Sequence, residues 1–186
     1  MQIPISKFDA ISQQTIEIRE PLLSDGAHMW RIAEDSRVLD TNSSYAYLLW
    51  CRDFPNTSMV AEIDGEVAGF VIGYTRPAWP NTLFVWQVAV DHPHRGHGLG
   101  VDMLDALLES CASQGVTQLE TTISPDNPAS VAMFASLARR RGAAMTRTPL
   151  FTADQFPGGH QPEDLYRIAP IATQRIAPNT LQEDWR

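Results

Sequence analysis

The chain has 186 residues, 44% of them hydrophobic, and its 22 acidic and 14 basic side chains give a net charge of −8. This length suffices for one hydrophobic core and is short for two, which predicts a single domain. The negative charge argues against a general nucleic-acid binder, because such proteins take their affinity from neutralising phosphates.

The domain is expected to cover residues 15–169. Residues 1–14 and 170–186 are polar, contain proline and lack sustained periodicity, which predicts a flexible N-terminus and a C-terminal tail. The chain's two cysteines form no metal-binding or disulfide spacing, and about 18 consecutive apolar residues occur nowhere. We therefore expect a cytoplasmic protein in a reducing compartment.

The first half of the chain predicts a strand over 15–20 and helices over 24–39 and 43–54. Ser24 or Asp25 could cap the first helix. Two β-branched runs over 57–76 are joined by Asp64-Gly65, a pair that accepts the positive φ angles of a hairpin turn. Two prolines predict a loop over 76–81 before the next strand at 82–91.

The second half changes to a helical period over 100–111, which Gly115 would end. A strand over 117–123 follows, then a helix over 127–141 with Pro128 in its first turn and Gly142 as its stop. Strands over 143–151 and 163–170 complete the pattern. The order βααβββαβαββ predicts a mixed α/β fold, with one sheet and helices on both faces.

The turn "RGHGLG" at 95–100 lies between a strand and an amphipathic helix, where free backbone amides can bind an anion. The third glycine of a dinucleotide fingerprint is absent, and no lysine follows as in a phosphate-binding P-loop. Two alternatives stay open. One is a glycine turn that binds nothing, and the other is a zinc site at His92, His94 and His97, although we expect no metal.

The strand "VWQVAVD", this turn and "NPASVAMF" from Asn127 together resemble the GCN5-related N-acetyltransferases (GNAT), which use acetyl-CoA. The resemblance implies a single mixed, mostly antiparallel sheet with a splayed central strand pair. It also implies that arginines 139–141 either meet the ribose phosphate or form a solvated helix end. The residues expected to bind the cofactor are Gln87, Val88, Ala89, Val90, Arg95, Gly96, His97, Gly98, Leu99, Gly100 and Asn127.

Four further stretches, "LDTNSSYAYLLWCRDF", "LFVWQVAVD", "LETTISPDN" and "HQPEDLYRI", resemble the L-2,4-diaminobutyrate acetyltransferases that make the N4-acetyl precursor of the osmolyte ectoine. The resemblance implies acetylation of the 4-amino group, a homodimer and a role in osmoprotection. Another small amine or amino acid as acceptor, or an acyl-CoA sensor without turnover, are the alternatives. The implied acceptor-binding residues are Asp40, Tyr45, Trp86 and Glu163.

The catalytic groups are less defined by the sequence. Many GNAT members carry a tyrosine where this chain has Phe134, and a phenyl ring cannot protonate a departing thiolate. Glu163, Asp40, Glu120 or a water could be the general base, with Glu163 taken as the catalytic candidate. A backbone amide near Val88 is expected to stabilise the oxyanion.

Overall fold

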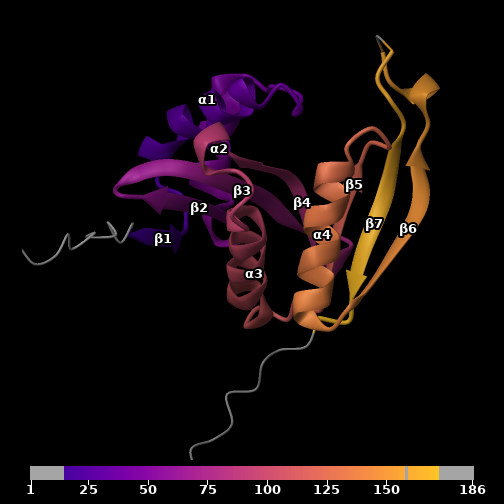
Figure 1. The fold of residues 1–186 in the computed structure, drawn as a ribbon. Helices are drawn as coiled ribbons and strands as arrows, with labels where there is room; N and C mark the ends of the chain where they lie inside the picture. Colours follow the sequence, from indigo (N-terminus) through magenta and orange to yellow (C-terminus); the bar gives the residue numbers. More distant parts are fainter. Residues whose placement is uncertain (1–14, 158, 172–186) are drawn as a thin grey trace, which may run out of the picture.

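The computed structural model describes residues 15–157 and 159–171. The N-terminus predicted over 1–14 lies outside them, as does the part of the tail predicted over 170–186 that follows residue 171. The described residues contain a seven-stranded sheet in the order β1-β2-β3-β4-β5-β7-β6 (Figure 1). Only the β4–β5 pair is parallel, so the sheet is mixed and mostly antiparallel, as predicted. The strands are Ile16–Arg19 (β1), Ser58–Ile63 (β2), Glu66–Arg76 (β3), Trp79–Val90 (β4), Gln118–Ile123 (β5), Ala144–Phe151 (β6) and Glu163–Ala169 (β7).

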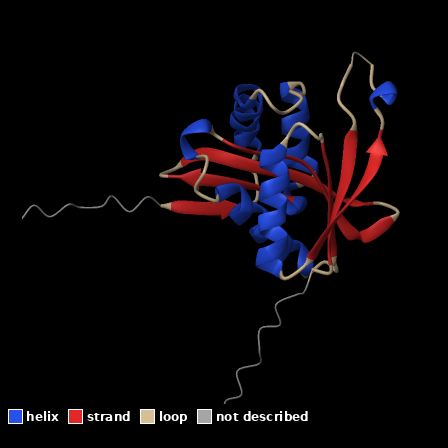
Figure 2. Ribbon diagram, turned by 45° about the vertical axis from the view of Figure 1, so that its right-hand side comes forward, coloured by secondary structure: helices blue, strands red, loops and turns tan. Residues whose placement is uncertain are grey.

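Helices cover both faces of this sheet (Figure 2). On one face, α1 (Gly26–Ser36) and α2 (Ser44–Asp53) pack against β2, β3 and β4 around Tyr47 and Phe70. On the other face, α3 (Leu99–Ala112) and α4 (Pro128–Arg141) enclose the larger core cluster. The leucines and methionine that repeat along α3 are fully buried, because their spacing places them on one side of the helix.

The central strands β4 and β5 separate after a short parallel ladder. Residues Thr82–Val85 of β4 pair with Gln118–Thr121 of β5, and both strands continue beyond this ladder without pairing to each other. At this point β4 has a bulge on its other side: Ile72 pairs with Gln87 and Gly73 with Val85, which leaves Trp86 as the extra residue. A bulge bends a strand and increases its twist, so it turns the second half of β4 away from β5.

Three boundaries differ from the sequence prediction. The predicted loop over 76–81 is wrong in its second half, since β4 begins at Trp79 and includes Pro80. The proline is tolerated because the β3–β4 register shifts between Thr75 and Arg76, and the ladder with β5 begins only at residue 82. Helix α1 ends at Ser36 because Arg37 adopts a left-handed conformation.

The third difference concerns the C-terminal boundary expected at residue 169. Ile171 is only 4% exposed, and its amide donates to the carbonyl of Thr117 at 2.8 Å. Packing of the core therefore extends two residues past the expected end of the domain.

Candidate active site

The glycine turn lies immediately before α3 and supplies free backbone donors. Gly96 and Gly98 have φ angles of +84° and +85°, which a residue with a Cβ adopts only with strain. The amide of Asp102 donates to the carbonyl of Gly98 at 3.0 Å, so the three amides before it have no partner within the helix. Arg95 donates from Nε to the carbonyl of Val90 at 2.8 Å, which holds its guanidinium beside the turn. This arrangement is suited to a pyrophosphate.

Gly100 has a packing reason for lacking a side chain. It is buried, and a Cβ at this position would lie 2.6 Å from Sδ of Met133 on α4. The small residue therefore allows α3 and α4 to approach each other, and its contact with the pyrophosphate stays a prediction.

The segment expected to reach the ribose end of the cofactor is occupied by structural contacts. Arg140 donates to Asp102 at 2.7 Å, and Arg141 donates to Asp105 at 2.5 Å. Arg141 is also only 6% exposed, so these two ion pairs join α4 to α3, whereas Arg139 bonds to Ser136 of its own helix and fits a solvated helix end. Asn127 accepts a hydrogen bond from the Ser130 amide at 3.1 Å, which makes its side chain an N-cap of α4.

Glu163 is the first residue of β7 and is half-buried near the open end of the splayed strands. Burial raises the pKa of its carboxyl above the ordinary value, because the charged form loses hydration. A hydrogen bond from Thr122 and the charge of His160 oppose this rise, while the nearby carboxylates of Asp40 and Asp126 add to it. A carboxyl with a raised pKa is suited to accept a proton near neutral pH.

His160 lies close to two of the predicted acids and was not among the residues predicted from the sequence. Its Nε2 lies 3.1 Å from Oδ2 of Asp40, and its Nδ1 lies 2.6 Å from the carbonyl of Gln161. The bond to that carbonyl raises the pKa of His160, and Asp40 and Glu163 raise it further. The signal was present in the stretch "HQPEDLYRI", but only the fold brings this loop to Asp40, 120 residues earlier.

The two predicted aromatic residues have different environments. Trp86, the bulged residue of β4, is 42% exposed and its ring lies 5.1 Å from that of Trp50. It therefore forms an exposed aromatic surface beside the splay, and its contact with the acceptor stays a prediction. Tyr45 lies in the first turn of α2 and is 64% exposed, with its ring toward solvent in this single chain.

The residues predicted to line the pantetheine arm follow the bulge in β4. Val88 and Val90 are partly buried against the larger core cluster, and the side chain of Ala89 packs with the smaller one. Gln87 is 5% exposed, and its side chain is bonded to Tyr47 and to the backbone of Asp40. That side chain therefore faces α2 and the segment before it, and a role of Gln87 in lining the cofactor arm stays a prediction.

Glu120, one of the candidate bases, is inaccessible. Its carboxylate is 1% exposed and accepts from Arg76 at 2.5 Å and from Arg167 at 2.8 Å. Both carboxylate oxygens are therefore engaged by arginines inside the protein, and neither is open to a substrate. The structure therefore supports a structural role for Glu120.

We expect Glu120→Gln to lower the free energy of unfolding by about 2 kcal/mol, because two arginines lose a buried counter-charge. The turnover number should stay within about twofold of the parent value, since Glu120 lies outside the reacting groups. Urea unfolding followed by circular dichroism and a thiol-release assay measure the two quantities. A loss of turnover of about 100-fold without a change in stability would identify Glu120 as the base.

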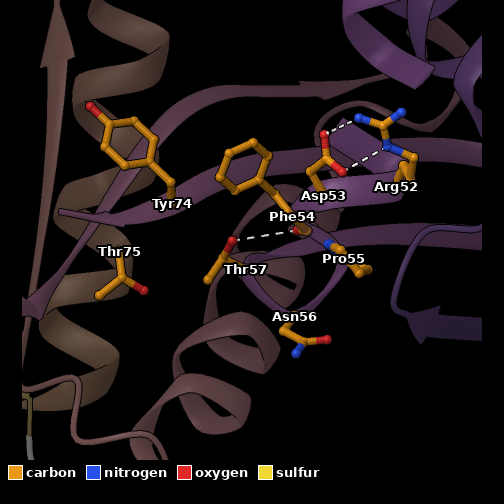
Figure 3. Close-up of a pocket in the computed structure, with 8 residues that line it drawn as sticks. All are labelled: Arg52, Asp53, Phe54, Pro55, Asn56, Thr57, Tyr74 and Thr75. Atoms are coloured by element: carbon orange, nitrogen blue, oxygen red, sulfur yellow. Dashed lines mark hydrogen bonds and ion pairs between the residues drawn. The ribbon is translucent and has the colours of Figure 1, made fainter. Parts of the chain in front are cut away.

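A separate hollow lies at the end of α2, between residues 52–57 and the end of β3 (Figure 3). Arg52 and Asp53 pair with each other across 2.7 Å, and the hydroxyl of Thr57 donates to the carbonyl of Phe54 (Figure 3). The hollow contains no residue of the glycine turn and none of the acids described above, so it is distinct from the candidate active site. Its lining residues are Arg52, Asp53, Phe54, Pro55, Asn56, Thr57, Tyr74 and Thr75.

Within residues 15–157 and 159–171, no three histidine, cysteine or acidic side chains are grouped so that they could hold a metal ion. The three histidines beside the glycine turn thus form no such group. In the same residues, no helix has both the length and the apolar character needed to cross a membrane.

The acetyltransferase (GNAT) family model matches residues 25–138, which include the splay, the glycine turn and most of α4. The chain belongs to this family. An L-2,4-diaminobutyric acid acetyltransferase of Nocardia farcinica is 66% identical over 160 residues, which are 86% of this chain and 83% of the relative. The Streptomyces coelicolor enzyme of the same name is 54% identical, over 87% of this chain and 96% of its own length. These identities place the chain in the diaminobutyrate branch of the GNAT family.

A solved GNAT structure agrees with this placement. The diaminobutyrate acetyltransferase EctA from Paenibacillus lautus, in complex with its substrate L-2,4-diaminobutyric acid and coenzyme A, is 38% identical. The match has a TM-score of 0.81 and covers 86% of this chain and 97% of that chain. The family, the branch and the fold predicted from the sequence motifs are thus confirmed.

Proposed function

We propose that this chain transfers the acetyl group of acetyl-CoA to the 4-amino group of L-2,4-diaminobutyrate, giving N4-acetyl-L-2,4-diaminobutyrate. The observation that carries the proposal is the position of two unlike sites at one end of β4 and β5. The glycine turn follows the end of β4, and Glu163 begins β7 where β7 pairs with the end of β5. A donor phosphate site and an acidic acceptor site thus flank the same splay.

On the donor side, free amides at the start of α3 and the charge of Arg95 would hold the pyrophosphate of acetyl-CoA. The part of β4 beyond Val85 has no partner on β5, so its backbone groups that point away from β3 are available to the pantetheine arm. We assign the oxyanion to the amide of Val88 within this part. These residues can hold the donor without any metal.

On the acceptor side, we assign substrate binding to the carboxylates of Glu163 and Asp40, which influence each other's charge, and to the exposed ring of Trp86. Two carboxylates are complementary to the two ammonium groups of diaminobutyrate, and they orient the amine for attack. We assign proton removal from the attacking amine to Glu163, directly or through a water, because burial raises its pKa.

The departing thiolate has no tyrosine at position 134. Phe134 is 2% exposed and packs within the larger core cluster. We propose that coenzyme A leaves without a side-chain acid, since a thiol has a much lower pKa than an alcohol.

The wider role is also a proposal. The names of the relatives support a place in ectoine synthesis and hence in osmoprotection, which would act in the cytoplasm. We further propose a homodimer. The exposed Leu150 and Phe151 support it, because they lie on β6, an edge strand with no second neighbour in the described sheet.

Thiol release from acetyl-CoA, measured side by side with diaminobutyrate, ornithine, lysine and spermidine, tests the function. Diaminobutyrate should give the highest kcat/KM, and mass and proton NMR spectra of the product should show acetylation at N4. A higher kcat/KM for another amine would support a different acceptor. Binding of acetyl-CoA without turnover of any amine would support the sensor alternative.

A further inference from the structure

Gln87 is a buried polar residue whose side chain joins three separate segments. It follows the bulged Trp86 on β4 and is 5% exposed. Its Nε2 donates to the backbone carbonyl of Asp40 at 2.9 Å, and its Oε1 accepts from the hydroxyl of Tyr47 at 3.0 Å. The amide orientation is determined by these partners, because a carbonyl can accept only from the NH2 end. Gln87 thus connects the central strand to the segment before α2.

That segment carries Asp40 and has other attachments nearby: Leu39 packs against the smaller core cluster, and Nδ2 of Asn42 donates to the carbonyl of Asp40 at 3.4 Å. At its start, the hydroxyl of Ser36 accepts from the amides of Val38 and Leu39 at 3.3 and 3.2 Å. The carboxylate of Asp40 is 84% exposed, and its partner is His160. No packing of its own side chain therefore holds Asp40 in place. Its position depends on the backbone, and Gln87 supplies the hydrogen bond from the sheet.

We infer that Gln87 is a positioning residue for the acceptor: it holds Asp40 beside Glu163, and the cofactor does not contact its side chain. This inference rests on the proposed function. The bulge strengthens it, because the same turn of β4 presents the Trp86 ring on the pocket and aims Gln87 at Asp40. The fully buried Tyr47 donates to the other end of the amide, whereas the bond to Asp40 is made by the NH2 end alone. The aromatic ring of Trp86 and the position of Asp40 thus both depend on two neighbouring residues of β4.

The test compares Gln87→Met, Tyr47→Phe and the double variant that combines them. Methionine has nearly the volume of glutamine but cannot donate to Asp40, so KM for diaminobutyrate should rise about tenfold. KM for acetyl-CoA should stay within about twofold of the parent value, because the substitution does not change the residues assigned to the donor. Tyr47→Phe keeps the bond from Gln87 to Asp40 and should leave both KM values near those of the parent.

The double variant separates positioning from stability. In Gln87→Met the buried Tyr47 hydroxyl loses its bond to Gln87, which lowers stability. Removing that hydroxyl should raise the melting temperature again but cannot restore the bond to Asp40. KM for diaminobutyrate should therefore remain high in the double variant. Thr82→Val is the control, because Thr82 is a fully buried polar residue of the same strand that bonds to Gln118, away from Asp40.

Three results would overturn the inference: recovery of KM in the double variant, an equal rise in KM for acetyl-CoA, or an unchanged KM for diaminobutyrate in Gln87→Met. Failure of the proposed function is distinct, because the parent enzyme would then prefer another amine. In that case the same variants are measured with the preferred amine, and the same three results decide.

Discussion

Replacement of Glu163 by glutamine is expected to lower kcat/KM for diaminobutyrate about 100-fold, with KM for acetyl-CoA unchanged. Glutamine keeps the size of the side chain but removes both the charge that attracts an ammonium group and the base that accepts its proton. The substitution also removes a half-buried carboxyl with a raised pKa, so the protein should fold at least as well. Initial rates, measured while each substrate is varied in turn, give kcat/KM for diaminobutyrate and KM for acetyl-CoA separately.

The pH profile gives a second readout for Glu163. Burial disfavours its charged form and raises its pKa, so the active, deprotonated form is lost at a higher pH than for an exposed glutamate. The acid limb of kcat/KM should therefore lie above the ordinary value of about 4.3, and it should be absent from Glu163→Gln. Glu66→Gln, at the exposed β2–β3 turn, is the control. Acceptor kinetics unaffected by Glu163→Gln would refute the assignment of the pocket.

Gly98→Val is expected to raise KM for acetyl-CoA about tenfold or more, which corresponds to the loss of at least one hydrogen bond to the pyrophosphate. KM for diaminobutyrate should stay near the parent value. Gly98 has φ +85° at the N-cap of α3, and a β-branched side chain there would shift the turn and screen the free amides. Isothermal titration calorimetry with coenzyme A measures the donor affinity directly.

Gly65→Val is a matched control for the backbone strain. Gly65 has φ +87°, and like Gly98 it has no atom within 4 Å of a built Cβ, but it lies in the β2–β3 hairpin. Both substitutions should cost about 2 kcal/mol of stability, because a side chain disfavours the left-handed conformation. Only Gly98→Val should weaken coenzyme A binding. Equal affinity in the two variants would mean that the glycine turn does not hold the donor.

Much of the fold could be predicted from local patterns. The order of helices and strands followed from periodicity, and Asp64-Gly65 located the hairpin, where both residues have positive φ angles. The start of β4 was missed because Pro80 ordinarily interrupts a ladder. Here a register shift leaves the proline without a required hydrogen bond, and such a shift depends on the neighbouring strand.

The donor half of the site was more accessible to sequence reasoning than the acceptor half. A strand, a glycine turn and a helix are contiguous, so their order alone predicts an anion site. The roles of individual residues were less predictable: Gly100 serves the contact with Met133, and Arg141 pairs with Asp105. Both contacts join α3 to α4, and no local pattern encodes which face of one helix meets the other.

The sequence by itself determined the type of each element, the position of the glycine turn and, through four separated stretches, the branch of the family. Only the tertiary structure decided that Glu120 is paired with two arginines, that His160 joins Asp40, and that Gln87 bonds to the backbone of Asp40. The physical reason is the range of the interactions. Hydrophobic period and turn chemistry act over a few residues, whereas these contacts join segments that the sheet alone brings together.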